Sequence, residues 1–200
     1  MSKVGCTSEI KINNDLFCIS LGLHYLCSMD YISIINRYYP EDNELRRLLL
    51  KHDRQVADRA LKIADRHPEW NIDREFLEAA AMLHDIGIIR CDAPGIHCHG
   101  TEPYLRHGPI GGEMLRQLDD ASLGKDRVEA LARVAERHTG TGLPGYEPET
   151  LEEQLICYAD KFYSKSSPDR EKTLEQAAQS LRKFGEAGVE KLMEWAREFE

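Results

Sequence analysis

The chain has 200 residues, with 35 acidic against 26 basic side chains and a formal net charge of −9. This length suits one compact domain, and the acidic balance without a lysine and arginine stripe argues against coating a nucleic-acid polymer. No apolar run approaches the roughly 20 residues that span a membrane, so no membrane partner is expected. The six cysteines have no C-x-x-C spacing, which is typical of reduced thiols in a cytoplasmic protein.

The first part of the chain differs from the rest in its pattern. Residues 1–38 mix apolar, cysteine, asparagine and tyrosine residues without a helical period. We interpret them as an N-terminal extension, and a true start at Met29 is a hypothesis. Residues 39–200 are expected to form one domain that includes the C-terminal helices.

Two amphipathic helices are predicted at the start of that domain. Pro40 and the acidic residues after it are typical of a helix start, and Pro68 ends the pattern. His52 falls on the apolar face of this helix. A second helix is predicted from Asp73, as its N-cap, to Gly87, where glycine stops it.

The middle of the chain is predicted as a long loop and two further helices. Residues 88–108 are punctuated by proline and glycine and are expected to be loop-like. Pro109 starts a helix to about Leu118, with His107 just before its N-terminus. Another helix is predicted over 125–138.

The C-terminal third completes an all-α pattern. Thr150 and Glu153 form a capping box for a helix that follows the glycine-rich loop 139–148. The tail, 169–199, predicts one or two amphipathic helices. Their expected anchors are Phe184, Val189, Leu192 and Trp195. Because no strand alternation is convincing, we predict a compact all-α helical bundle.

A histidine and an aspartate lie side by side in the apolar stretch AAAMLHDIGIIR, residues 79–90. An unpaired buried carboxylate is costly, so a compensating cation is expected at His84 and Asp85. Other histidines and an aspartate lie on apolar helix faces or helix ends. Imidazole and carboxylate together suit Fe, Mn, Co, Ni or Zn, and facing helices can each supply a ligand. The predicted metal ligands are His52, His84, Asp85, His107, His138 and Asp160.

These residues resemble the H…HD…D pattern of the HD-domain metal-dependent phosphohydrolases. The likeness rests on His52, the HDIG motif with His84 and Asp85, and Asp160 in YADK. It covers about residues 40–199. His107 and His138 resemble the two added histidines of the binuclear H…HD…H…H…D branch.

The resemblance implies a set of roles for these residues. His52, His84, Asp85 and Asp160 would hold one metal ion, and His107, His138 and a bridging Asp85 a second. A mononuclear centre, with His107 and His138 contacting substrate phosphate, is the alternative. Asp85 would be the catalytic residue that positions a metal-activated hydroxide for attack on a phosphoryl group.

Departures from relatives leave the substrate broad. Residues 86–90 lack the acidic pair of the stringent-response hydrolases. Ile88 and the single His138 depart from the lysine and paired histidines of the cyclic-dinucleotide phosphodiesterases. A small nucleotide-like phosphoester or phosphoanhydride is expected, with no expectation for the oligomeric state. The alternatives are an HD-domain di-iron oxygenase and a non-catalytic nucleotide-sensing module.

Three basic residues adjoin the proposed ligands. Lys161, Arg106 and Arg137 are candidate substrate-binding residues, although helical geometry turns Lys161 about 100° from Asp160 and favours a solvated side chain. Within loop 91–106, the IHCHG stretch favours a rim or lid beside the active site over a zinc site.

Overall fold

The computed structural model describes residues 29–118, 123–140 and 145–200. The hypothesis of a start at Met29 concerns residues 1–28, which lie outside the described part, as do residues 141–144 of the predicted glycine-rich loop. The main helices are α2 (Tyr31–Tyr38), α3 (Glu44–Arg66), α4 (Arg74–Leu83), α5 (His107–Arg116), α6 (Lys125–Arg137), α7 (Leu151–Asp160), α8 (Leu174–Leu181) and α9 (Glu186–Phe199). The described chain is therefore an all-α bundle, as predicted.

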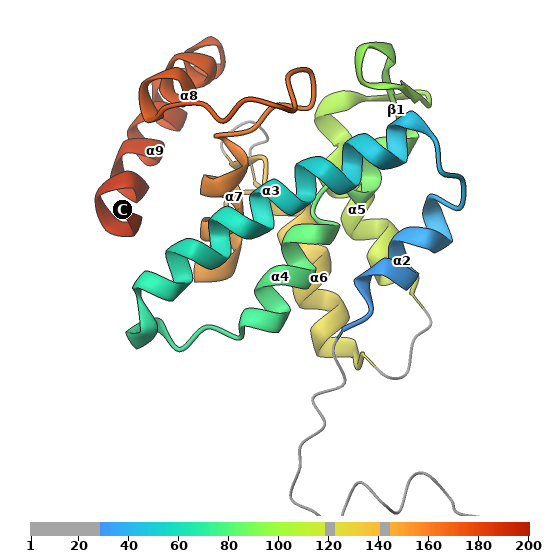
Figure 1. Ribbon diagram of the computed structural model, residues 1–200, viewed down its shortest axis with the longest axis horizontal. Coiled ribbons are helices and arrows are strands. Elements are labelled where there is room, and N and C mark those ends of the chain that lie inside the picture. Colours follow the sequence, from blue (N-terminus) through green and yellow to red (C-terminus); the bar gives the residue numbers. More distant parts are fainter. Residues whose placement is uncertain (1–28, 119–122, 141–144) are drawn as a thin grey trace, which may run out of the picture.

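Helix α3 crosses the whole molecule and packs against α4 and α7 (Figure 1). It begins later than Pro40, because Asn43 is its N-cap and accepts a hydrogen bond from the Arg46 amide. The apolar stripe predicted from the sequence is buried, with Leu49 and Val56 fully inside. His52 lies on this stripe and is 1% exposed.

Residues that showed no helical period in the sequence form helix α2. The Asp30 side chain caps it by accepting a hydrogen bond from the Ser33 amide. Ile34 and Ile35 are buried in the same hydrophobic core as α3 and α4. The Tyr39 hydroxyl, directly after α2, donates to the Ile86 carbonyl oxygen at 2.8 Å and ties this segment to the centre of the domain.

Helices α4 and α5 differ from their predicted ends, and both differences concern site residues. Asp73 caps α4 as predicted, but the helix ends at Leu83 with His84 as its C-cap. A 3₁₀ helix, η2 (Ile86–Arg90), follows. Helix α5 begins at His107 rather than at Pro109, so this histidine is inside its first turn.

A close contact between η2 and α5 depends on glycine. A Cβ atom at Gly87 would lie 2.2 Å from the His107 carbonyl oxygen and 2.5 Å from the Gly111 amide nitrogen. At Gly108 a Cβ atom would lie 2.9 Å from the Ala135 carbonyl oxygen of α6. The absence of a side chain at these two positions lets α5 approach the HD doublet.

The predicted loop 88–108 contains regular structure that the sequence did not indicate. It forms strands β1 (Cys91–Ala93), β2 (Cys98–His99) and β3 (Glu102–Pro103), in the order β2-β1-β3. Strand β1 pairs antiparallel with β2 and parallel with β3. Strands of two or three residues are too short to show an alternating pattern, which is why periodicity missed them.

The C-terminal segment stands at one end of the molecule, where α9 packs against α7 and α8 packs against α9 (Figure 1). The capping box of Thr150 and Glu153 at the start of α7 is present as predicted. Of the expected tail anchors, Leu192 and Trp195 are buried, whereas Phe184 is 54% exposed. Phe184 lies in the short 3₁₀ helix η6 (Arg182–Phe184) between α8 and α9, so it does not belong to the apolar face of either helix.

Within the described ranges, none of the helices combines the length and the apolar character that crossing a membrane requires.

Candidate metal centre

Five helices, α3 to α7, bring the predicted ligands together at one buried place. His52 comes from the middle of α3, His84 from the C-cap of α4, His107 from the first residue of α5 and His138 from the C-cap of α6. Asp160 is the last residue of α7. The four histidines are at most 5% exposed, and Asp85 is fully buried.

The first group consists of His52, His84, Asp85 and Asp160, whose ligand atoms all lie within 4.8 Å of one another. The Nε2 atom of His52 is 3.2 Å from Oδ2 of Asp85 and 3.0 Å from Oδ1 of Asp160. The Nε2 atom of His84 lies 3.2 Å and 3.8 Å from the same two oxygens. Two imidazoles and two carboxylates therefore face one space.

The second group consists of Asp85, His107 and His138 and shares the aspartate with the first. The Oδ1 atom of Asp85 is 3.3 Å from Nε2 of His107 and 3.4 Å from Nε2 of His138. Since Oδ2 of Asp85 faces the first group, one carboxylate presents one oxygen to each group. Asp85 could therefore be a ligand in both groups.

Three of the histidines are oriented by the same local hydrogen bond. The Nδ1 atom faces the carbonyl oxygen three residues earlier at 2.6 Å in His84, 2.5 Å in His107 and 2.7 Å in His138. A carbonyl oxygen only accepts, so Nδ1–H donates, and Nε2 carries a lone pair whenever the ring is neutral. Such hydrogen bonds fix the tautomer of metal-binding histidines.

Several buried atoms of the centre fit a bound cation. Within the described part of the chain, Nε2 of His84 and both oxygens of Asp85 are buried without a hydrogen bond of good geometry. The Nε2 atoms of His107 and His138 lie 2.9 Å apart, although the tautomers derived above give both a lone pair there. A divalent ion bound by these atoms would compensate both features, so the residues fit a metal.

The acids and imidazoles of the centre have strongly shifted pKa values. Burial raises the pKa of Asp85 and of Asp160, but neighbouring lysines and histidines outweigh it and hold both pKa values well below the usual range. Burial lowers the pKa of His138 to about 3, which keeps this ring neutral. Burial would also lower the pKa of His84, but the charges of Asp85 and Asp53 raise it well above its ordinary value.

Lys165 is a residue of the centre that sequence analysis missed. Its side chain is 9% exposed, and its ammonium group forms an ion pair with Oδ2 of Asp85. The same Nζ atom is 3.1 Å from Nε2 of His52. Lys165 lies in the irregular segment after α7, so no helical register could have placed it.

Asp53 is a second buried acid that the sequence did not single out. It is fully buried next to His52, and its Oδ1 atom lies 3.7 Å from Nδ1 of His84. Burial raises the pKa of its carboxyl group, against the opposing charge of His84. This carboxyl group therefore faces the rear of a ligand ring.

A cavity of about 270 Å³ opens over the two groups. His52, His107, His138 and Asp160 lie at its floor, and four lysines line its walls. The lysines are Lys161, Lys165, Lys172 and Lys183. Asp160 is the only acidic residue among the lining residues that the structure describes, although the whole chain carries a net charge of −9.

The three predicted substrate-binding residues lie in different places. Lys161 is only 14% exposed and lines the cavity, where its Nζ atom donates to Oδ2 of Asp160 at 3.1 Å and to the His138 carbonyl oxygen at 2.9 Å. The expectation that Lys161 points into solvent is wrong, because α7 ends at Asp160 and the chain turns. Arg106 is exposed and is not a lining residue of this cavity.

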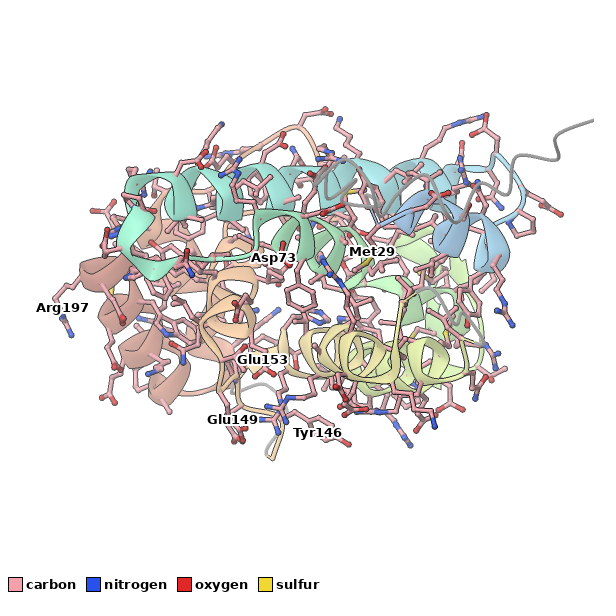
Figure 2. The ribbon with its side chains drawn as sticks, turned by 90° about the horizontal axis from the view of Figure 1, so that it is seen from below. Met29, Asp73, Tyr146, Glu149, Glu153 and Arg197 are labelled. Atoms are coloured by element: carbon pink, nitrogen blue, oxygen red, sulfur yellow. The ribbon has the colours of Figure 1, made fainter. Side chains whose placement is uncertain are left out.

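Arg137 also lies away from the cavity. Its guanidinium group is 2.9 Å from the Glu149 carboxylate, and Arg133 forms ion pairs with Glu149 and Glu153. Figure 2 shows Glu149 and Glu153 close together near the start of α7. Arg137 therefore links α6 to the segment before α7.

The segment 91–106 borders the cavity. Tyr104 and Leu105 line it, and Tyr104 also lines a second hollow with Lys165 and Ser164. His97 pairs with Glu44 at 3.1 Å, and Cys98 is buried. Among the described residues, the IHCHG stretch contributes no ligand to a metal-compatible group. Tyr104 and Leu105 thus border the cavity, whereas no IHCHG residue is among its described lining residues, so the rim or lid role of that stretch stays a prediction.

Comparison with family models places the ligand residues within one known domain family. The family model described as HD domain matches residues 49–164, which include all six predicted ligands. An uncharacterised protein of Methanocaldococcus jannaschii is 33% identical over 128 residues, which is 57% of this chain and 65% of that protein.

Two further relatives carry the name tRNA (cytidine(56)-2'-O)-methyltransferase. The protein of Picrophilus torridus is 29% identical over 129 residues, 58% of this chain and 32% of that protein. The protein of Thermoplasma volcanium is 28% identical over 151 residues, 68% of this chain and 37% of that protein. The chain thus spans 65% or less of the length of these relatives. No solved structure matches this chain.

The family match covers more than half of the sequence and includes the residues that converge in the structure. The chain belongs to the HD domain family.

Proposed function

We propose that the protein is a metal-dependent phosphohydrolase that cleaves a phosphoester or phosphoanhydride bond of a small nucleotide-like substrate. The observation that carries this proposal is the lysine-lined cavity over the six ligands. An acidic protein repels anions, so four lysines around one opening create a local site for a polyanion.

The four lysines would have different roles in binding the phosphate groups of the substrate. Lys161 is held by Asp160 and the His138 carbonyl oxygen, so it orients the ligand aspartate. Lys165 lies deepest, against Asp85, and is the side chain best placed to contact a phosphoryl oxygen near the ligands. Lys172 and Lys183 also line the cavity and would bind further phosphate groups of the substrate.

Asp85 would be the central residue of the reaction. One or two divalent ions, of Fe, Mn, Co, Ni or Zn, would lower the pKa of a water molecule and polarise the phosphoryl group. Asp85 presents one oxygen to each ligand group and thereby fixes the spacing between the two halves of the site. His84, His107 and His138 are held by their Nδ1 hydrogen bonds, so they need no rearrangement to bind.

The alternatives receive less support from the cavity. A di-iron oxygenase acting on an uncharged substrate would have no use for four lysines. The similarity to the two proteins named methyltransferase spans only 32% and 37% of their length, so it does not support methyl transfer by this chain.

The test combines elemental analysis with a phosphate-release screen over mono- and dinucleotides. We expect up to two divalent ions per chain and metal-dependent phosphate release. Asp85→Ala should abolish turnover and deplete metal, whereas Asp92→Ala, which removes an exposed carboxylate of β1, should change neither. Metal and activity retained by the Asp85→Ala protein would contradict the mechanism. Oxygen consumption without phosphate release would favour the oxygenase.

A further inference from the structure

A second cavity, of about 250 Å³, adjoins the lysine-lined one. The two cavities share four lining residues, which therefore form their common wall. These are Thr139, Lys161, Leu181 and Gly188. The second cavity therefore lies directly beside the cavity over the metal centre.

The described lining of the second cavity is mostly apolar, with Leu192 and Trp195 buried. Its two charged side chains other than Lys161 have partners already. Lys191 pairs with Glu194 at 3.1 Å, and Glu147 accepts a hydrogen bond from the Gly145 amide at 3.2 Å. An anionic ligand group would therefore find no free cation here, and the mostly apolar lining favours an uncharged group.

One polar side-chain atom on the common wall is unpaired among the described residues. The hydroxyl oxygen of Thr139 is buried, and it has no hydrogen-bond partner in the described ranges. Buried polar atoms are normally paired, so this hydroxyl group is suited to a donor or acceptor on a bound molecule.

The outer wall comes from chain segments beyond the family match. The HD domain model ends at residue 164, whereas Leu181, Ala187, Lys191 and Trp195 follow it on α8 and α9. The C-terminal helices therefore complete a cavity whose other lining residues, from Thr139 to Lys161, lie in the segment that matches the family model.

We propose that the second cavity binds an uncharged, largely apolar ring of the substrate whose phosphate lies at the metal centre. The proposal rests on the proposed function, because it places a phosphoryl group in the first cavity. Separately the two cavities are small, but together they reach the range of about 300–1,000 Å³ that small-molecule sites occupy. The common wall joins an anion-binding half to an apolar half.

The experiment measures binding of phosphonates, whose C–P bond the reaction does not cleave, by calorimetry on the metal-loaded protein. Two matched pairs differ only in the ring: phenylphosphonate against methylphosphonate, and the phosphonate analogue of AMP against that of ribose 5-phosphate. Ala187→Trp fills the second cavity from the exposed first turn of α9. Met193→Trp is the control, since Met193 is 38% exposed and lines neither cavity.

We expect the ring-bearing member of at least one pair to bind at least tenfold more tightly than its partner. Ala187→Trp should reduce this difference to twofold or less, and Met193→Trp should preserve it. A response of phenylphosphonate alone would place the ring directly on the phosphate group, and a response of the AMP analogue alone would place it across a ribose. Equal affinities within both pairs, or an equal loss for ring-free members in Ala187→Trp, would overturn the proposal.

The experiment distinguishes a failure of the second-cavity proposal from a failure of the proposed function. A ring preference that Ala187→Trp removes, in a protein that releases no phosphate from any nucleotide, would support the second cavity and refute hydrolysis. Phosphate release without any ring preference would support hydrolysis and refute the second cavity. Because Ala187 is exposed, an unchanged melting temperature shows that the variant is folded.

Discussion

The residues of the metal centre differ in how clearly the sequence indicates them. The six ligands were named from their places on helix faces and helix ends, and the structure brings all six together in two groups. Lys165 and Asp53 were missed for physical reasons. Lys165 depends on the path of an irregular segment after α7, and Asp53 faces His84 only because α3 packs against α4.

Loss of the Lys165 ammonium group should weaken catalysis while sparing the metal. A hydrogen bond to a charged group contributes about 1.5–3 kcal/mol, so Lys165→Met should lower kcat/KM for phosphate release roughly 10- to 100-fold. The six ligand residues are unchanged in this variant, so metal content should stay at the wild-type level. Lys62→Met, on the exposed face of α3, is the matched control. Wild-type kcat/KM in Lys165→Met would show that this lysine does not contact the phosphoryl group.

Metal binding should release a proton from His84. The pKa of His84 is raised well above its ordinary value, so in the metal-free protein this ring is protonated at pH 7. Coordination requires the neutral ring, so the proton must leave, and metal affinity should fall as pH decreases. Calorimetric titration with Mn²⁺ in buffers of different ionisation enthalpy measures the release. His99→Ala, which removes an exposed histidine, should release the same number of protons, and a binding enthalpy that is independent of the buffer would contradict the prediction.

Helix ends, more than helix interiors, determine where the ligands lie. The predicted N-caps at Asp73 and Thr150 are confirmed, because a capping side chain has a local signal. The start of α3 was misplaced because both Pro40 and Asn43 are acceptable helix starts, and only tertiary packing distinguishes them. The strands of segment 91–106 were missed because pairs of two or three residues have no period.

Because η2 contacts α5 at Gly87, a substitution of Gly87 should disturb the second ligand group and spare the first. Gly87→Ala would bring a methyl group against the His107 carbonyl oxygen, which must move with the start of α5. We expect a lower melting temperature and a loss of about one metal ion per chain, because His107 belongs to the second group. Gly95→Ala is the matched control, since a Cβ atom there meets nothing within 4 Å. Full metal content in Gly87→Ala would show that α5 adjusts without moving His107.

The whole molecule combines an acidic chain with a buried polar centre. Its hydrophobic core surrounds two carboxylates and four imidazoles at the metal centre, and burial of such groups is unfavourable unless a cation compensates them. Composition and hydrophobic period predicted the helical class, since these are properties of the chain as a whole. The adjoining apolar cavity was not predictable, because its walls come from α7, α8, α9 and the segments between helices, whose relative placement no local pattern encodes.

Metal binding should therefore stabilise the fold as well as support the reaction. At a free metal concentration of 100 times Kd, binding adds about 2.7 kcal/mol to the free energy of unfolding. For a chain of this size this corresponds to a rise of roughly 5–10 °C in Tm relative to chelator-treated protein, measured by scanning calorimetry. Asp85→Ala, which removes the residue shared by both groups, should show little or no rise. Equal Tm values with and without metal in the wild-type protein would contradict the prediction.

The order of segments along the chain has an evolutionary consequence. All six ligands precede residue 161, whereas α8 and α9 begin only after residue 173. If the second cavity binds part of the substrate as proposed, mutation of the last 27 residues would alter which molecules are accepted and leave the six ligands unchanged. Exchange of this tail between homologues offers a direct route to new selectivity, and divergence among such proteins should concentrate there.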